Sequence, residues 1–256
     1  MKFGICTSPQ SIARLAPGTA DYVEMNLSQI AEMSAGQLAD TAAQLRAAGV
    51  PAESTNGFFP RTVRLNGAGY SRETVLEYSR RALEKAARLG IHTCVLGSGG
   101  SRNIEDGYDR AEAERQFEEA VAAAGDAAAE FDTTVVLEPL NHKETNLLHT
   151  VAEGAVICRR LHHPHVMLLA DLYHVGVENE PMSVIEENGD ILRHVHIACP
   201  IGRGAPKPLD PYDYRPFARA LKAAGYDLRI SIEGGIPGIF RQSASQSLAF
   251  LRQIFR

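Results

Sequence analysis

Four apolar segments in the second half of the chain each end near a residue that can bind a metal ion. They are TTVVLEP with Glu138, VMLLADLYH with Asp171, RHVHIA with His196 and RISIEGG with Glu233. A carboxylate that follows an apolar segment is costly to bury unless it is paired or bound to a cation. One such glutamate is usually a salt-bridge or capping residue, but four polar ends in succession are not explained in that way. Three carboxylates and one imidazole suit a single divalent ion, for which we expect Mn²⁺, with Mg²⁺, Co²⁺ or Zn²⁺ as alternatives.

The alternation of side chains along a strand makes this prediction specific. If Glu138 points to one face of its strand, Val136 shares that face, and Val135 and Leu137 lie on the other. The same rule places Ser231 with Glu233, Leu169 with Asp171, and His194 with His196. Residues predicted to share the inner face are Thr134, Val136, Met167, Leu169, His194 and Ser231.

The elements that must position these residues alternate regularly along the whole chain. Strands are predicted at 2–6, 22–25, 52–54, 93–96, 133–137, 166–170, 192–197 and 228–232. Between and after them, Ala-rich amphipathic helices are predicted at 35–48, 72–89, 110–131, 150–162, 181–188, 213–224 and 241–255. This alternation implies parallel strands. Eight units in 256 residues predict an α/β fold, a single (β/α)₈ TIM barrel, in one domain over residues 1–256. An open doubly wound sheet is the alternative.

In such a barrel the C-terminal ends of the strands form one rim, where active sites lie. The four polar strand ends therefore converge in this prediction. Glu24 ends the segment DYVEMN in the same way, so we also expect it at the mouth as a substrate contact.

Four local motifs carry a family resemblance. The segment from Glu138 to Glu144, EPLNHKE, resembles an EPLNxxE motif, and DLYH from Asp171 resembles DxxH. HVHIA from His194 resembles HxHIA, and SIE ending at Glu233 resembles a final-strand motif. Together they resemble the xylose-isomerase-like sugar (phosphate) isomerase/epimerase superfamily, in particular ketose 3-epimerases of the tagatose/allulose kind and hydroxypyruvate isomerases.

The resemblance implies roles for individual residues. It implies that Glu138, Asp171, His196 and Glu233 are the metal ligands, and that Glu138 and Glu233 are also the acid/base pair. It further implies that Glu144, His174 and Arg203 contact the substrate. Many relatives carry an acidic residue where this chain has Cys199, to which we assign no role.

The expected chemistry is proton transfer next to a carbonyl. A metal ion chelated by a carbonyl and its neighbouring hydroxyl would stabilise an enediolate. One glutamate would remove the proton, a contribution of about 10²–10⁴-fold. A second glutamate on the opposite face would complete an epimerisation, whereas one base suffices for aldose–ketose isomerisation. We therefore expect an isomerase or epimerase that acts on a ketose, a sugar phosphate or a small hydroxy-keto compound.

Three other functions fit parts of the pattern. The same metal site could serve an inosose-type dehydratase. An apurinic endonuclease would need three metals and histidines that this chain lacks after its third and fourth strands. A non-catalytic sugar-binding barrel would not need both Glu138 and Glu233. Solvent deuterium incorporated into a ketose would separate the isomerase from the binding protein.

Composition limits the partners. The formal charge of −5 argues against nucleic acid, and no apolar run is long enough to cross a membrane. Four widely spaced cysteines indicate free thiols and a cytoplasmic protein. We expect a small sugar-like substrate as the ligand and a homodimer or homotetramer as the assembly.

Minor signals receive less weight. The loop with Asn56, Phe58 and Phe59 could shield the site from water or pack as an ordinary loop. His162, His163 and His165 fall at the opposite end of the barrel and are read as surface residues. Lys207 could join Arg203 in gripping a phosphate, although both could equally be solvated. The glycine-rich GSGGSRN loop lacks the features of a nucleotide-binding loop.

Overall fold

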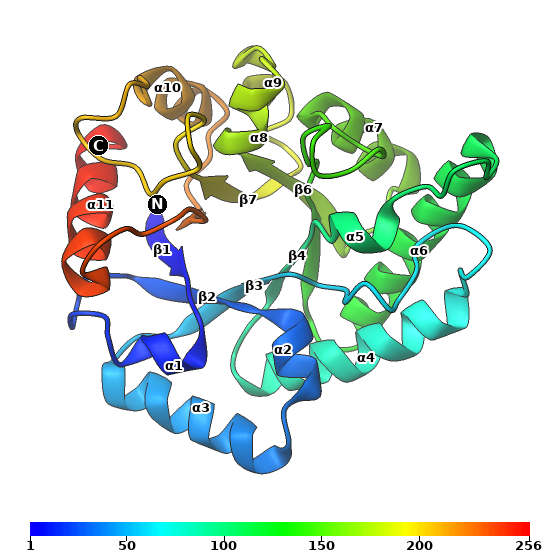
Figure 1. Cartoon of the computed structure of the whole chain (residues 1–256), viewed down its shortest axis with the longest axis horizontal. Coiled ribbons are helices and arrows are strands. Elements are labelled where there is room, and N and C mark those ends of the chain that lie inside the picture. Colours follow the sequence, from blue (N-terminus) through cyan, green and yellow to red (C-terminus); the bar gives the residue numbers. More distant parts are fainter.

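The fold is a closed barrel of eight parallel strands that follow one another in chain order (Figure 1). A computed structural model describes all residues, 1–256. The last strand, β8 (Arg229–Ile232), pairs with the first, β1 (Lys2–Cys6), so the sheet has no free edge. The predicted TIM barrel is confirmed, and the open doubly wound sheet is excluded.

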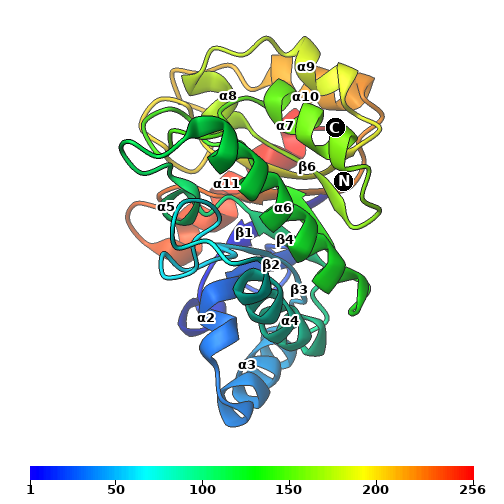
Figure 2. The same ribbon diagram turned by 90° about the vertical axis from the view of Figure 1, so that its right-hand side faces the viewer.

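The remaining strands are β2 (Tyr22–Asn26), β3 (Ala52–Asn56), β4 (Thr93–Leu96), β5 (Thr134–Leu137), β6 (Val166–Asp171) and β7 (Leu192–Ile197). The longer helices are α3 (Ala35–Ala48), α4 (Arg72–Arg88), α6 (Arg110–Ala129), α7 (Val151–Leu161), α10 (Arg215–Ala223) and α11 (Phe240–Ile254). The short helices are α1 (Pro9–Ile12), α2 (Leu27–Glu32), α5 (Gly99–Arg102), α8 (Leu172–Val177) and α9 (Ser183–Glu187). Figure 2 shows the same elements from the side.

Each predicted long helix is present, and its ends have physical causes. In α3, Ser34 and Gln37 form a reciprocal capping box, and Gly49 ends the helix with a φ of 63°. Four short helices of 4–6 residues were not predicted, because fewer than two turns leave too little periodicity to detect. Among them, α8 matters for function, since it starts directly at the end of β6 with Asp171 as its N-cap.

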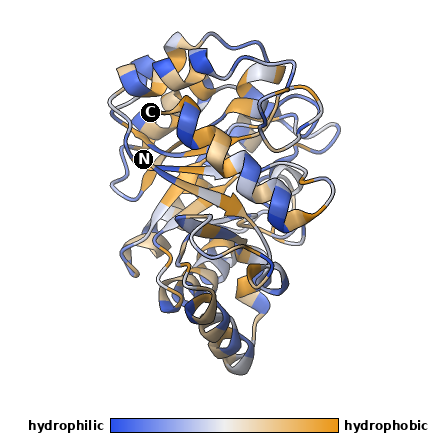
Figure 3. Ribbon diagram, turned by 90° about the vertical axis from the view of Figure 1, so that its left-hand side faces the viewer, coloured by the Kyte–Doolittle hydropathy of each residue, from blue (hydrophilic) through white to orange (hydrophobic).

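The hydrophobic core has two parts. The larger part lies between the sheet and the helices and contains 61 buried residues. The smaller part, Val95, Val136 and Leu169 with Met167 beside it, is separate from the larger one. Because the strands alternate, this small group is the barrel interior, which confirms the predicted inward direction of Val136 and Leu169. Figure 3 shows hydrophobic strands at the centre and helices of mixed character around them.

The interior near β2, β3, β7 and β8 is polar instead. Glu24, Ser54, His194 and Ser231 are all fully buried and hydrogen-bonded to one another. Tyr22 also enters this region, where its hydroxyl lies 2.7 Å from Ser231 Oγ. A Cβ atom at position 4 would overlap the Tyr22 ring, which explains Gly4 in β1. One half of the barrel interior is thus apolar and the other half carries a hydrogen-bonded polar layer.

The two chain ends lie side by side next to the β1–β8 seam in Figures 1 and 2. The rings of Phe3 and Phe255 are 5.9 Å apart, and the N-terminal amine pairs with Asp227. The four cysteines are free, as predicted. No helix is long and apolar enough to span a membrane.

Candidate active site

The four predicted metal ligands converge at the C-terminal rim of the barrel. Their ligand atoms, one from each of Glu138, Asp171, His196 and Glu233, all lie within 4.8 Å of one another. Strand register explains part of this, because Asp171 lies beside His196 across β6 and β7. Glu138 and Glu233 follow directly after β5 and β8.

The imidazole of His196 points one nitrogen at this cluster. Its Nδ1 lies 3.1 Å from Glu138 Oε1 and 3.7 Å from Glu233 Oε2. Asp171 Oδ1 accepts the Tyr173 N–H at 2.9 Å, whereas Asp171 Oδ2 is buried with no hydrogen-bond partner. A buried carboxylate oxygen without a partner is unusual, and such an oxygen is suited to bind a cation or to carry a proton.

The electrostatics agree with this geometry. Burial raises the pKa of Asp171 to about 8, and the Glu233 carboxylate adds to the rise. Burial and Glu233 also raise the pKa of Glu138, although His196 opposes them. Burial lowers the pKa of His196, but Glu24, Glu233 and Glu138 outweigh it and hold the pKa well above its ordinary value. The cluster therefore has an excess of acceptor groups that compete for positive charge.

These residues fit a divalent cation. They supply carboxylate oxygens and one imidazole nitrogen from four neighbouring strands, and one buried oxygen is unpartnered. Such oxygen-rich sets with one nitrogen suit Mn²⁺, Mg²⁺ or Co²⁺.

His174 is turned differently from His196: its Nε2, and not its Nδ1, faces the acidic cluster. Its Nδ1 accepts the backbone N–H of Asn141 at 3.0 Å, so in the neutral ring the proton must be on Nε2. That Nε2 is buried without a hydrogen-bond partner, 3.5 Å from Asp171 Oδ2. Burial lowers the pKa of His174 to about 3, and Arg203 adds to the effect. His174 is therefore a neutral ring with an N–H beside the predicted ligand Asp171.

Arg203 and Glu144 reach the same mouth from the loops that follow β7 and β5. Arg203 Nη1 lies 2.7 Å from Glu144 Oε1, and its Nη2 lies 3.0 Å from Glu233 Oε2. The guanidinium also lies 4.5 Å from the centre of the Tyr173 ring. The backbone of Arg203 has a φ of 50°, which lies in the left-handed region. The sequence-predicted residues Glu144, His174 and Arg203 are thus brought together around the acidic cluster.

Glu24 is not where we expected it. The side chain is 0% exposed and lies beneath His196, one layer inside the barrel. Its Oε1 accepts from His196 Nε2 at 2.8 Å, and its Oε2 accepts from His194 Nε2 at 2.7 Å. Glu24 is not exposed at the mouth because β2 continues two residues beyond it, to Asn26, and both of its oxygens are bonded by buried histidines.

Several residues support the site in roles that were not predicted. Asn56 donates to Glu233 Oε1 at 2.9 Å, and Asn141 donates to both Glu144 and His174. Asn141 belongs to the EPLN motif, which was a usable signal. Fully buried Arg102 donates to the backbone oxygen of Glu138 at 2.8 Å, and no signal in the glycine-rich loop predicted this.

A family model described as a xylose isomerase-like TIM barrel matches residues 15–254. The chain belongs to this family. Curated relatives include a ketose 3-epimerase of Arthrobacter globiformis, 28% identical over 53% of this chain and 47% of that protein. A 3-dehydro-D-guloside 4-epimerase of Escherichia coli is 28% identical over 77% of this chain and 74% of that protein. The match thus spans less than half of the ketose epimerase.

A solved structure shares the whole fold of this chain. A D-psicose 3-epimerase crystallised in the presence of D-fructose superimposes with a TM-score of 0.85, over 100% of this chain and 99% of that chain. The identity is 20%, so this likeness concerns the fold.

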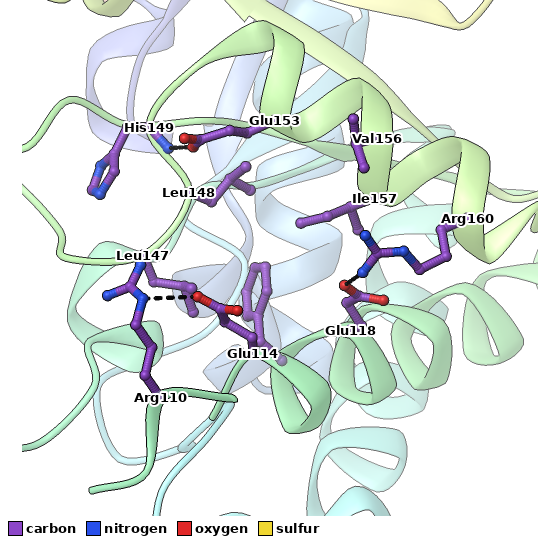
Figure 4. A pocket seen from close by; sticks show the side chains of 11 residues that line it. Arg110, Glu114, Glu118, Leu147, Leu148, His149, Glu153, Val156, Ile157 and Arg160 are labelled. Carbon is purple, nitrogen blue, oxygen red and sulfur yellow. Dashed lines mark hydrogen bonds and ion pairs between the residues drawn. The ribbon is translucent and has the colours of Figure 1, made fainter. Parts of the chain in front are cut away.

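Two cavities lie differently with respect to the predicted site residues. One, of about 260 Å³, opens at the mouth and is lined by Asn56, Glu138, Glu144, Arg203 and Glu233 among others. Another, of about 290 Å³, lies outside the barrel between α6 and α7 (Figure 4). Its rim carries the ion pairs Arg110–Glu114 and Arg160–Glu118, and none of the predicted site residues lines it. The mouth cavity is therefore the candidate active site.

Three minor expectations can now be resolved. Phe58 and Phe59 pack in the main core, where Phe59 lies 5.3 Å from Tyr78, so they are ordinary loop packing and not a shield. The histidines His162, His163 and His165 lie between the end of α7 and the start of β6, as predicted. Exposed Lys207 pairs with Asp210, whereas Arg203 points into the mouth.

Proposed function

We propose that this protein is a metal-dependent epimerase or isomerase of an uncharged keto-sugar. The observation that carries the proposal is that ligand atoms of Glu138, Asp171, His196 and Glu233 converge within 4.8 Å, with Glu138 and Glu233 lining the mouth cavity. The named relatives are sugar epimerases, which supports the same reaction class.

Glu138 and Glu233 would move the protons. They reach the cavity from β5 and β8, three strands apart around the barrel, so a carbon held between them has one carboxylate on each side. Proton removal on one side and return on the other inverts that carbon. A bound divalent cation would polarise the substrate carbonyl and stabilise the negative charge that develops, an effect of several kcal/mol.

The remaining residues would orient the sugar. The Nε2–H of His174 has no partner in the protein and can donate to a substrate oxygen. Arg203 and Glu144 are paired at 2.7 Å, and together they offer donors and acceptors to hydroxyl groups. Because Arg203 also contacts Glu233, a substrate that takes hydrogen bonds from Arg203 would release that carboxylate for proton transfer.

The charges of the site favour an uncharged substrate. Four carboxylates surround the mouth, namely Glu138, Glu144, Asp171 and Glu233, and Arg203 is already paired with two of them. A divalent cation would still leave the acidic groups in excess. A phosphate or carboxylate on the substrate would be repelled, so we favour a ketose over a sugar phosphate or hydroxypyruvate. The volume of about 260 Å³ suits a monosaccharide-sized ligand.

The test is a panel of substrates assayed with Mn²⁺ in deuterated water. It contains D-psicose, D-tagatose, L-ribulose, 3-dehydro-D-guloside, a ketose phosphate, hydroxypyruvate and an inosose. We expect deuterium to enter at least one uncharged keto-sugar at the carbon next to its carbonyl, with formation of an epimer or an aldose.

Other results would point elsewhere. Faster turnover of the phosphate or of hydroxypyruvate would refute the choice of an uncharged substrate. Loss of water from the inosose without epimer formation would indicate a dehydratase. Binding of a sugar without any deuterium exchange would refute the catalytic proposal.

A further inference from the structure

Glu24 is the most completely bonded carboxylate in the barrel interior. It accepts hydrogen bonds from four side chains on three other strands: Ser54 in β3, His194 and His196 in β7, and Ser231 in β8. All five side chains are 0% exposed. Neither oxygen of Glu24 faces the mouth cavity, so the residue cannot touch a substrate there.

The bond from His196 connects this layer to the metal-ligand cluster. His196 Nε2 lies 2.8 Å from Glu24 Oε1, while Nδ1 of the same ring faces Glu138 and Glu233. A carboxylate accepts hydrogen bonds, so Nε2 must carry the proton. Nδ1 of the same ring lies 3.1 Å from Glu138 Oε1 and can also carry a proton. When a cation replaces that proton, the lone pair of Nδ1 points at the cluster, and Nε2 still donates to Glu24.

We propose that Glu24 is a positioning residue that holds His196 in the tautomer and orientation required for a metal ligand. This inference rests on the proposed metal centre and adds a residue to it. Metal-bound histidines generally donate their other N–H to a carboxylate or carbonyl, and loss of that partner typically costs about 10- to 100-fold in metal affinity.

The contrast with His174 supports this assignment. There Nδ1 accepts a backbone N–H from Asn141, so the N–H points toward the cluster instead of a lone pair. Two histidines at one site therefore present opposite groups, and the partner behind each ring determines which group it presents.

The remaining bonds keep Glu24 in place. Ser54 Oγ and Ser231 Oγ donate to Oε2 at 2.7 Å and 2.6 Å. The hydroxyl of Tyr22 lies 2.7 Å from Ser231 Oγ and helps to hold it. Oε1 is thereby left to His196. Cys6 lies near Glu24 and His196 and could complete a second ion site with them. However, both oxygens of Glu24 are already used by hydrogen-bond donors, so we assign them to positioning.

The test compares the affinity of purified wild-type protein for Mn²⁺ with that of variants, by calorimetric titration. Glu24→Gln keeps the shape, but its amide N–H₂ can face Nε2 and favour the tautomer with a proton on Nδ1. We expect Glu24→Gln to bind Mn²⁺ about 10- to 100-fold more weakly. Glu53→Gln is the matched control, because Glu53 in β3 pairs with Lys2 and Arg229, outside the layer. Ser54→Ala, which removes only one bond to Oε2, should weaken binding less than Glu24→Gln.

The outcomes separate the inference from the proposed function. Absence of Mn²⁺ binding to the wild type would refute the metal centre itself. Binding to the wild type and equally to Glu24→Gln would refute the positioning role alone. A lower unfolding temperature of metal-free Glu24→Gln with unchanged Mn²⁺ affinity would show a merely structural role.

A second measurement uses the wild type and does not depend on the variant folding. In Zn²⁺-loaded protein with ¹⁵N-labelled histidine, NMR should show a protonated Nε2 and a metal-bound Nδ1 for His196. A metal-bound or unprotonated Nε2, or two zinc ions per chain, would overturn the proposal.

Discussion

At the scale of single residues, the site works by giving similar groups different partners. His196 donates a hydrogen bond to the carboxylate of Glu24, whereas His174 accepts one from the backbone N–H of Asn141. Glu138 has no cationic side-chain partner except His196, whereas Glu233 is bonded by Asn56 and Arg203. Identical side-chain types therefore take different roles.

Removing the two histidines should have different effects. His196→Ala removes the only imidazole ligand, so we expect loss of most Mn²⁺ binding. His174→Ala removes an N–H donor and leaves the ligands in place, so metal content should stay near one ion per chain while turnover falls. Metal analysis after dialysis, together with kcat, checks this. An equal loss of metal in both variants would contradict the assignment of His174 to the substrate.

The two glutamates should be separable by solvent exchange. Glu138→Gln and Glu233→Gln keep the size of the side chain and one carbonyl oxygen but lose the base, which contributes about 10²–10⁴-fold. In a two-base epimerisation each variant should fail in the full interconversion while deuterium exchange from one epimer survives slowly. In a one-base isomerisation only one variant should lose exchange. Near wild-type turnover in both metal-loaded variants would refute both schemes.

Metal binding should release a proton at neutral pH. The pKa of Asp171 is raised to about 8 by burial and by Glu233, so at pH 7 this group is mostly protonated in the metal-free protein. A ligand must be deprotonated, and the pKa values of both Asp171 and His196 lie above their ordinary values, so Mn²⁺ affinity should increase as the pH rises through about 8. Calorimetry in two buffers of different ionisation heat measures the released proton. No proton release at pH 7 would contradict the raised pKa.

The raised pKa of Asp171 also determines how the stability of the metal-free protein changes with pH. The folded-state pKa of Asp171 lies above its unfolded value, so this group stabilises the metal-free fold most at low pH and loses that contribution as the pH rises toward about 8.

At the scale of elements, the strand ends determine what fits at the mouth. Gly97 follows β4, and a Cβ atom there would overlap Glu138 Oε2. Arg102 in α5 fixes the neighbouring backbone by donating to the carbonyls of Glu138 and Leu148. The glycine-rich loop after β4 thus makes room for the glutamate that follows the adjacent strand, β5.

Gly97→Ala should displace Glu138 without unfolding the barrel. We expect activity to fall by an amount similar to that of Glu138→Gln, about 10²-fold or more, while circular dichroism remains native. Gly36→Ala is the control, because a Cβ atom at position 36 in α3 meets nothing closer than 3.9 Å. It should keep full activity and stabilise the helix by about 0.5–1 kcal/mol. Full activity of Gly97→Ala would show that Glu138 does not need its observed position.

At the scale of the whole molecule, one site joins half of the barrel. Glu138, Asp171, His196 and Glu233 come from four successive strands, and Glu24 connects them to β2. A cation bound there would connect β5, β6, β7 and β8 directly, and β2 through Glu24. Because these residues converge only in the folded chain, the cation would bind only that state.

The metal should therefore raise the unfolding temperature. An ion at about 100 times its Kd stabilises a fold by about 2.7 kcal/mol. For a chain of this size that corresponds to roughly 5–10 °C. Thermal unfolding with and without Mn²⁺ measures the shift, and elemental analysis should find about one ion per chain. An unchanged unfolding temperature, or three ions per chain, would contradict a single structural and catalytic ion. The homodimer or homotetramer, the cytoplasmic location and the single domain stay predictions.

Much of this molecule could be predicted from sequence because the signals are local. A barrel strand buried on both sides reads as an apolar run, so TTVVLEP and RISIEGG mark both the strand and the polar residue at its end. Parallel alternation then places all such ends on one rim. For the same reason the convergence of Glu138, Asp171, His196 and Glu233 and the inward direction of Val136 and Leu169 could be predicted from the sequence alone.

What the tertiary structure decided depends on depth and on long-range partners. Glu24 and Glu138 both follow apolar residues, yet β2 runs on to Asn26 and leaves Glu24 buried within the strand, whereas β5 ends at Leu137 and Glu138 lines the cavity. The tautomers of His174 and His196 depend on partners 33 and 172 positions away in the chain. Sequence spacing carries no information about such contacts, because only closure of the barrel brings β2, β5, β6, β7 and β8 around one point.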